Sequence, residues 1–306
     1  MPTPNESCII LAGATGDLGE RIARHLLKKG ATVLALVRPA SARDEIAVLR
    51  KLGATIVEVD FDSLPQLTHA CQGGTCVVSA LSGLREVIVD TQTKLLHAAV
   101  EARVPRFIPS DYCIDYTQTP EGTNRNLDLR REFRQCLDQA PIQATSILNG
   151  MFADLLTGQA PVVLYPFKRI VYWGDADQPL DFTTIADTAE YTAAAALDPT
   201  TPRDLRIAGD VLSPRDLRQV ASQATGNGYK LFRVGSLGTL DVMIKVTKTL
   251  MPAQNEVFPP WQGMQYLRNM LSGQAKLTSL DNDRYPAIRW TKVQEVIALH
   301  VQTQKS

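Results

Sequence analysis

Three glycines occupy a short turn near the start of the chain, in the sequence GATGDLG at residues 13–19. The turn follows an apolar run at residues 8–12 and leads into a stretch with helical periodicity at residues 19–29. In that position glycines permit a tight turn and let the backbone approach a pyrophosphate, while the free N–H groups of the helix face the phosphates. The spacing therefore predicts a dinucleotide-binding turn, and the alternative is a tight turn that binds nothing.

The second apolar run, at residues 32–37, ends in Arg38 and Pro39. Sites that prefer NAD(H) usually present an acidic residue about 20 residues after the glycine turn. No acid stands at this place, and a guanidinium there can pair with a 2′-phosphate, with Ser41 or Arg43 as a helper. We therefore predict NADP(H) as the cofactor; the alternative is an arginine that only faces solvent.

Further candidates follow the third, fourth and fifth predicted strands. Asp60 could accept a hydrogen bond from the adenine amino group and Phe61 could pack beside the ring, although a polar strand end with one anchoring aromatic residue is an open alternative. The sequences SALSG at residues 79–83 and PSDY at residues 109–112 end the next two strands. Because open α/β sheets bind ligands at the carboxyl ends of their strands, we expect both segments to line the same site.

The elements that must position these residues alternate along the first half of the chain. Short runs rich in β-branched residues predict strands at residues 8–12, 32–37, 55–59, 76–79, 106–108 and 145–148. Longer amphipathic stretches predict helices at residues 19–29, 42–52, 64–70, 87–102 and 128–139. This alternation predicts βαβ units, a parallel sheet and an α/β fold of the Rossmann-type, doubly wound kind.

Beyond residue 149 the alternation of strands and helices loosens. We therefore predict an NADP(H)-binding Rossmann domain over residues 1–150 and a smaller mixed α/β domain on the substrate side over residues 151–306. The segment at residues 181–212 could return to the first domain, which would make the boundary interleaved.

Composition and charge exclude several classes of function. Thirty-two basic residues balance 32 acidic ones without a Lys/Arg run, so the electrostatic signature of a nucleic-acid-binding protein is missing. Apolar segments are interrupted before the roughly 20 residues that cross a bilayer, and we expect no signal peptide from the polar residues at 1–7. Five cysteines and four histidines lack metal-ligand spacing. We expect a soluble, cytoplasmic protein that binds no metal, nucleic acid or membrane.

Several segments together resemble the NmrA-like branch of the atypical short-chain dehydrogenases, which is related to isoflavone reductase. They are the turn at residues 13–19, QTKLL at 92–96, RFIPSDY at 106–112, NGMF at 149–152, PLDFTT at 179–184 and DNDRYP at 281–286. The resemblance covers most of the chain, and its N-terminal motifs are specific to the superfamily rather than to a substrate.

The resemblance implies roles for residues at matching positions. The pyrophosphate would be held by Gly13, Thr15, Gly16, Asp17, Leu18 and Gly19. The 2′-phosphate would pair with Arg38, and the adenosine and ribose would be lined by Ser79, Ala80 and Leu81. The nicotinamide and the substrate mouth would be framed by Pro109, Ser110, Tyr112, Asn149, Met151 and Phe152.

The chain departs from this resemblance in its acid–base residues. Ordinary short-chain dehydrogenases use a Tyr-x-x-x-Lys pair, in which lysine lowers the tyrosine pKa, and no such pair occurs here. Isoflavone-reductase-like enzymes carry a lysine on the helix after the fifth strand, but no lysine lies between Lys94 and Lys168. Tyr112 or Asp111 could substitute, with Tyr112 as the candidate catalytic residue. Alternatively, Tyr112 only packs or contacts the cofactor.

Two functions are open at this point. The first is an NADPH-dependent reductase of a small, aromatic or enone-like substrate, because hydride transfer needs orientation and a polarised acceptor more than a strong base. The second is a non-catalytic NADP(H)-binding redox sensor that acts through a regulatory protein partner, which the missing acid–base pair favours and the NmrA resemblance suggests. A sensor requires different affinities for the oxidised and reduced cofactor.

Overall fold

The computed structural model describes residues 7–304 and divides into two compact units. Unit 1 consists of the described part of Met1–Asp111 together with Leu129–Ile147 and Thr188–Leu205. Unit 2 consists of Tyr112–Asp128, Leu148–Asp187 and the described part of Arg206–Ser306. The chain therefore passes repeatedly from one unit to the other, and part of the segment at residues 181–212 belongs to unit 1.

Unit 1 is built on a parallel six-stranded sheet with the order β3-β2-β1-β4-β5-β6. Its strands are β1 (Cys8–Ala12), β2 (Thr32–Val37), β3 (Thr55–Glu58), β4 (Cys76–Ser79), β5 (Arg106–Ile108) and β6 (Gln143–Ala144). The strand order reverses between β1 and β4, which is the point where doubly wound sheets bind ligands. The predicted Rossmann-type fold is confirmed.

The strand predicted at residues 145–148 is corrected in one respect. The sixth strand of the sheet, β6, ends at Ala144, and the following β7 (Ser146–Leu148) pairs with β12 (Asp204–Arg206) in a separate two-stranded sheet. The apolar run is thus not part of the Rossmann sheet.

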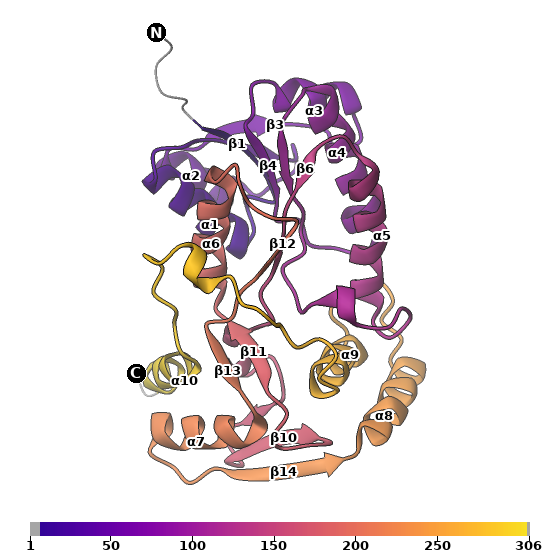
Figure 1. Ribbon diagram of the computed structural model, residues 1–306, viewed down its shortest axis with the longest axis vertical. Helices are drawn as coiled ribbons and strands as arrows, with labels where there is room; N and C mark the ends of the chain where they lie inside the picture. The colour runs from indigo at the N-terminus through magenta and orange to yellow at the C-terminus, as the bar shows by residue number, and fades with distance from the viewer. Residues whose placement is uncertain (1–6, 305–306) are drawn as a thin grey trace. The chain divides into compact units, whose positions relative to one another are not determined.

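Helices cover both faces of the six-stranded sheet. They are α1 (Asp17–Lys28), α2 (Arg43–Leu52), α3 (Leu64–Cys71), α4 (Gln92–Glu101), α5 (Arg125–Gln139) and α6 (Ile185–Leu197). Figure 1 shows α1 and α2 on one side of the sheet and α3, α4 and the greater part of α5 on the other. The first turns of the helix predicted at residues 87–102 form a π-helix at Glu86–Thr91, which the apolar periodicity did not indicate.

Arg106, on β5, joins unit 1's outlying segment to its sheet. Its side chain is buried, and the guanidinium donates to Ala196 O at 2.9 Å, to Ala195 O at 2.9 Å and to Thr201 Oγ1 at 2.7 Å. A buried charge needs such compensation, because desolvation of an unpaired guanidinium is costly. The segment Thr188–Leu205 is therefore an integral part of unit 1.

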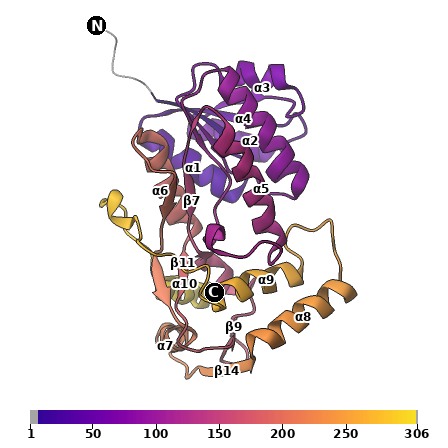
Figure 2. The ribbon, with the colours of Figure 1, turned by 45° about the vertical axis from the view of Figure 1, so that its right-hand side comes forward.

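The described part of unit 2 contains two small three-stranded sheets and four α-helices. One sheet has the order β14 (Lys230–Gly235), β10 (Arg169–Trp173), β9 (Val163–Leu164), and the other has the order β13 (Asp210–Leu212), β11 (Leu180–Thr183), β8 (Met151–Phe152). Parallel and antiparallel pairs occur in both sheets. The helices are α7 (Pro214–Thr225), α8 (Leu237–Leu250), α9 (Pro260–Leu271) and α10 (Val293–Thr303). Figures 1 and 2 both show α8 beside α9.

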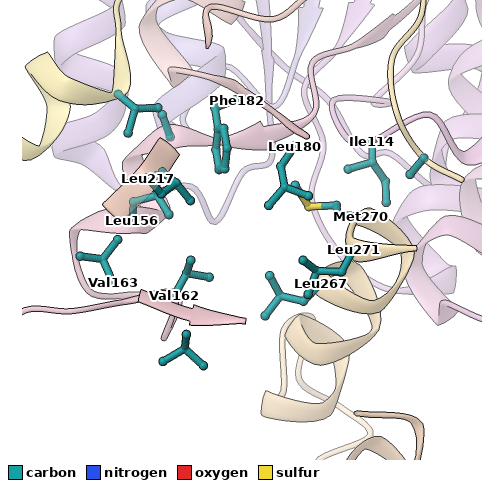
Figure 3. Packing of buried hydrophobic residues seen from close by; sticks show 14 of the residues in the cluster. Ile114, Leu156, Val162, Val163, Leu180, Phe182, Leu217, Leu267, Met270 and Leu271 are labelled. Carbon is teal, nitrogen blue, oxygen red and sulfur yellow. The ribbon is translucent and has the colours of Figure 1, made fainter. Parts of the chain in front are cut away.

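The core of unit 2 lies between these sheets and helices. In Figure 3, apolar side chains from β9, β11, α7 and α9 point toward one another. Among them are Val163, Leu180, Phe182, Leu217 and Leu271, all of which are buried. Burial of so many apolar side chains is the main stabilising contribution to such a unit.

Candidate functional site

The glycine turn lies between β1 and α1, as predicted. Gly13 has φ +80°, and a Cβ built on it would lie 2.5 Å from Ala80 O. A Cβ built on Gly19 would lie 2.1 Å from Gly13 O. Because both contacts are with backbone atoms, neither glycine can carry a side chain unless the turn shifts. The two glycines thus bring the turn against the end of β4 and bring α1 against the turn.

The N-terminus of α1 has the features of an anion site. Gly16 is the N-cap and no side chain caps the helix. Gly16 and Asp17 are exposed, whereas Thr15 and Leu18 are partly buried. The first N–H groups of α1 can therefore serve a phosphate. The Asp17 carboxylate pairs with Arg21 on the same helix at 2.5 Å.

The ends of β2 and β3 bring two of the predicted cofactor residues together. The exposed Arg38 places its Cζ 5.8 Å from the centroid of the Phe61 ring, and Phe61 is buried. Asp60 is exposed, and its carboxylate accepts a hydrogen bond from Asp62 N at 2.9 Å. A hydrogen bond from Lys94 lowers the pKa of the Asp62 carboxyl. Arg38 and Phe61 thus form one surface, while the Asp60 carboxylate is engaged in its own turn.

The ends of β4 and β5 are joined by a side-chain hydrogen bond. Ser110 Oγ donates to Leu81 O at 2.5 Å, and Ser110, Leu81 and Pro109 are buried. Ser79 is fully buried, whereas Ala80 is partly exposed. The structure therefore brings these predicted cofactor residues to the same edge of the sheet as the glycine turn.

Sequence reasoning missed one residue at this edge. Gln92 is fully buried, and its carboxamide accepts a hydrogen bond from Ser110 N at 3.0 Å and donates one to Ile88 O at 2.7 Å. A signal for it existed, because Gln92 shares the buried helical face of Leu95 and Leu96, where a polar side chain is unusual.

The substrate-side candidates lie in unit 2 on adjoining segments. Asn149 N donates to Cys113 O at 2.9 Å, and Cys113 follows Tyr112 directly. Tyr112 is 7% exposed and Asn149 is fully buried, whereas Met151 and Phe152 are partly buried. Tyr112 and the residue 149–152 turn are therefore brought close together within this unit.

A buried ion pair in unit 2 was also not predicted. Lys276 Nζ donates to Asp181 Oδ1 at 2.5 Å, and Asp181 Oδ2 accepts from Leu277 N at 2.8 Å. Burial raises the pKa of the Asp181 carboxyl, although Lys276 acts in the opposite direction. A small opening with a cavity volume of about 10 Å³ lies beside the pair. It is lined by Ile114, Gly150, Pro179, Leu180, Asp181, Met270, Ala275 and Lys276.

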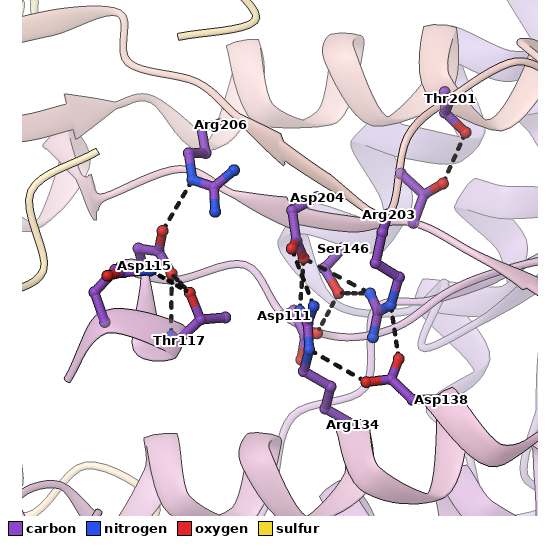
Figure 4. A network of polar contacts seen from close by, with 12 residues as sticks. Asp111, Asp115, Thr117, Arg134, Asp138, Ser146, Thr201, Arg203, Asp204 and Arg206 are labelled. Carbon is purple, nitrogen blue, oxygen red and sulfur yellow. Dashed lines mark hydrogen bonds and ion pairs between the residues drawn. The ribbon is translucent and has the colours of Figure 1, made fainter. Parts of the chain in front are cut away.

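Asp111, the alternative proton-transfer residue, belongs to a polar network of unit 1 (Figure 4). Its Oδ2 accepts a hydrogen bond from Ser146 Oγ at 2.7 Å, and Ser146 Oγ accepts one from Arg203 Nη1 at 2.6 Å. Beside them Arg134 Nη1 lies 2.6 Å from Asp204 Oδ1. Asp111 is 1% exposed, so these contacts assign it a structural part in holding the segments of unit 1 together.

Within residues 7–304 there is no cluster of metal ligands and no helix that could span a membrane, and Cys71 and Cys76 are buried. In that range no three His, Cys, Asp or Glu side chains gather as metal ligands, and none of the helices combines the length and the apolar character that a membrane span needs. Burial raises the pKa of Cys71 and of Cys76 to about 12, so both thiols stay protonated at neutral pH.

The chain is similar in sequence to plant reductases. Among curated proteins, pinoresinol reductase 1 of Arabidopsis thaliana is 32% identical over 236 residues, which cover 71% of this chain and 74% of the relative. The isoflavone reductase homolog IRL of Zea mays is 28% identical over 239 residues, 74% of this chain and 76% of the relative.

Solved structures share the fold across nearly the whole chain. The structure of AtPrR2 with NADP⁺ and (+)-pinoresinol has a TM-score of 0.84 at 23% identity and covers 98% of this chain and 100% of that chain. The crystal structure of isoflavone reductase has a TM-score of 0.82 at 20% identity, with 96% and 99% covered. The sequence model of the NmrA-like family matches residues 5–254. This chain therefore belongs to the NmrA-like family.

Proposed function

We propose that this chain is an NADPH-dependent reductase of a small molecule, with a substrate of aromatic or enone-like character. The observation that carries the proposal is the glycine turn, in which Gly13 and Gly19 allow backbone approaches that any side chain would block, beside an uncapped α1 N-terminus. A turn of this kind is suited to a dinucleotide pyrophosphate. Arg38 over Phe61 supports a 2′-phosphate beside the adenosine.

The relatives support the same reaction class. Pinoresinol reductase 1 and the isoflavone reductase homolog are both named as reductases, and one structure of the same fold holds NADP⁺ together with (+)-pinoresinol. The aromatic or enone-like substrate of this chain is our extension of that similarity.

In this proposal some residues of the chain bind the cofactor and another transfers a proton. Bound NADPH supplies the hydride. The α1 N-terminus would hold the pyrophosphate, Arg38 would hold the 2′-phosphate, and Pro109 with Ser110 would frame the nicotinamide. Tyr112, at the fourth position after β5, is the candidate to donate a proton to the reduced substrate, because a phenol hydroxyl is a donor at neutral pH.

The test is substrate-dependent oxidation of NADPH by the purified protein, measured as loss of NADPH absorbance over a panel of small enones and aromatic ethers. Gly16→Trp should abolish it, because Gly16 is exposed at the α1 N-terminus and a large ring there would occupy the phosphate position. Ala47→Trp, on the exposed face of α2, adds the same side chain away from the turn and should retain activity. Full activity in the Gly16 variant would refute this placement.

The redox sensor is the second candidate, and the absence of a Tyr-x-x-x-Lys pair and of any lysine between Lys94 and Lys168 favours it. A sensor must bind NADPH and NADP⁺ with different affinities, because a ligand shifts an equilibrium only by differential binding. Calorimetric titration with both forms tests it. Equal affinities would exclude the sensor, whereas a marked preference without turnover on any substrate would exclude the reductase.

A further inference from the structure

The segment that leads into α4 has an unusual backbone. Glu86–Thr91 forms a π-helix, and α4 continues from Gln92 as an ordinary α-helix. π-helical turns are rare and are frequent at functional sites. Here the turn is supported by side chains, because Thr91 Oγ1 donates to Glu86 O at 2.7 Å and Gln92 Nε2 donates to Ile88 O at 2.7 Å.

The Gln92 carboxamide has a second partner on a different element. Its Oε1 accepts the hydrogen bond of Ser110 N at 3.0 Å, at the carboxyl end of β5. Gln92 is fully buried and Ser110 is 4% exposed, so water cannot take over either bond. A carboxamide is required at this position, because one end must donate to a carbonyl and the other must accept from an N–H group.

Ser110 connects the end of β5 to the end of β4. Its Oγ donates to Leu81 O at the end of β4, and the preceding Ala80 has its carbonyl oxygen where a Cβ of Gly13 would lie. Ala80 N in turn donates to Ala12 O at 2.8 Å. Gln92 therefore acts on the end of β5 through Ser110, whereas the contacts of the turn after β1 are made by the backbone of Ala80 and involve neither Gln92 nor Ser110.

We propose that Gln92 is a positioning residue that fixes the backbone of Ser110 for the nicotinamide half of the dinucleotide. The inference rests on the proposed function, since it assumes a dinucleotide at this edge of the sheet. Gln92 is buried beneath the edge and acts through Ser110. The pyrophosphate turn and the Arg38–Phe61 surface do not depend on the Gln92 carboxamide for their own contacts.

The proposal predicts that loss of the Gln92 carboxamide affects binding of the nicotinamide half of NADPH and not binding of the adenosine half. Without the carboxamide, Ser110 N would be buried without its acceptor and the end of β5 would move to find another. Such a movement affects a ligand that reaches β5, whereas 2′,5′-ADP, which lacks the nicotinamide, depends on the glycine turn and on Arg38. A residue that merely stabilised the fold would weaken both ligands equally.

The experiment compares NADPH and 2′,5′-ADP binding by calorimetry in the wild type, Gln92→Met and Thr91→Val. The methionine variant retains chain length but loses both hydrogen bonds, while Thr91→Val removes one hydrogen bond from the same π-helix without touching β5. In Gln92→Met we expect NADPH affinity to fall about tenfold or more and 2′,5′-ADP affinity to change by less than about twofold. Thr91→Val should leave both unchanged.

NADPH fluorescence supplies a readout that structural support alone would not alter, since it responds to the surroundings of the nicotinamide. We expect saturating NADPH to show a weaker enhancement in Gln92→Met than in the wild type. Gln92→Glu keeps the acceptor for Ser110 N, so its fluorescence enhancement should lie between those of the wild type and Gln92→Met. It provides a second variant if Gln92→Met does not fold.

Two results would overturn the inference. Either NADPH binding and fluorescence in the Gln92 variants match the wild type, or both ligands weaken by the same factor. A wild-type protein that binds neither ligand would instead refute the proposed function itself, and with it the premise of the inference. If the wild type binds both ligands but turns over no substrate, the comparison of their affinities between variants is still valid, because the affinities do not depend on catalysis.

Discussion

The guanidinium of Arg38 lies over the ring of Phe61, with Cζ 5.8 Å from the ring centroid, at the ends of the neighbouring strands β2 and β3. The contact holds an exposed charge beside an aromatic surface. Arg38→Glu should therefore reduce the preference for NADPH over NADH by at least about tenfold, because it replaces attraction for the 2′-phosphate with repulsion. Titration calorimetry with both cofactors measures the change. Lys51→Glu, on exposed α2, makes the same charge change elsewhere, and an equal effect there would contradict a local role for Arg38.

Gly19 and Gly16 should respond differently to alanine. A Cβ on Gly19 would lie 2.1 Å from Gly13 O, whereas the nearest atom to a Cβ on Gly16 is Gly13 O at 3.5 Å. Gly19→Ala should thus destabilise the protein by roughly 1–3 kcal/mol through overpacking, and Gly16→Ala by less than about 1 kcal/mol. Denaturant unfolding without ligand measures both. Equal losses would mean that α1 can move away from the turn.

Asp181 should give stability a pH dependence of known sign. Burial raises its pKa above 3.8, so the folded protein binds this proton more readily than the unfolded chain does. Its contribution to the free energy of unfolding therefore falls as the pH rises from 3.8 through the raised pKa, and is constant above it. Compared with Asp181→Asn, the wild type should lose stability over that interval in urea unfolding.

Asp177 supplies a control of opposite sign for that experiment. A hydrogen bond from Arg215 lowers the pKa of this exposed carboxyl. Its stabilising contribution is present above 3.8 and is lost as the pH falls through the lowered pKa. Asp177→Asn should therefore change the pH profile in the other direction, and matching profiles for the two variants would contradict the role of burial at Asp181.

Tyr112→Phe tests the candidate proton donor. If the phenol donates a proton during reduction, kcat/KM should fall by about 10²–10⁴, while the Kd for NADPH changes little. Steady-state kinetics and calorimetry separate the two. Tyr116→Phe makes the same chemical change at a fully buried site in the same segment and should retain turnover. If Tyr112→Phe keeps the wild-type kcat/KM, Tyr112 is not the proton donor and only packs in the structure.

The sequence predicts the parallel sheet well because its signals are local. Apolar runs and glycines between them indicate β1 to β5 and the turn after β1, since each depends on residues that are neighbours in the chain. The split between β6 and β7 was not foreseen, because the partner of β7 lies some sixty residues away in β12. The periodicity of apolar residues indicates which side chains are buried, but it does not indicate which distant strand a given strand pairs with.

The residues of the candidate site differ in how far the sequence indicates them. The glycine motif and Arg38 follow from type and position, whereas Gln92 and the Asp181–Lys276 pair become visible only when remote segments meet. Gln92 gave a faint signal as a polar residue on an apolar helical face. Lys276 gave none, because its partner is 95 residues away and a lysine in a loop is usually exposed.

The buried contacts of Arg106 limit how early unit 1 can fold while the chain is being synthesised. Its guanidinium partners, the carbonyls of Ala195 and Ala196 and the hydroxyl of Thr201, are synthesised about ninety residues after it. A nascent chain that has emerged only as far as β6 cannot yet complete unit 1, since a charge destined for the interior still lacks its acceptors. Folding on the ribosome should consequently wait for α6, and ribosome-bound chains that end before residue 188 should remain sensitive to protease.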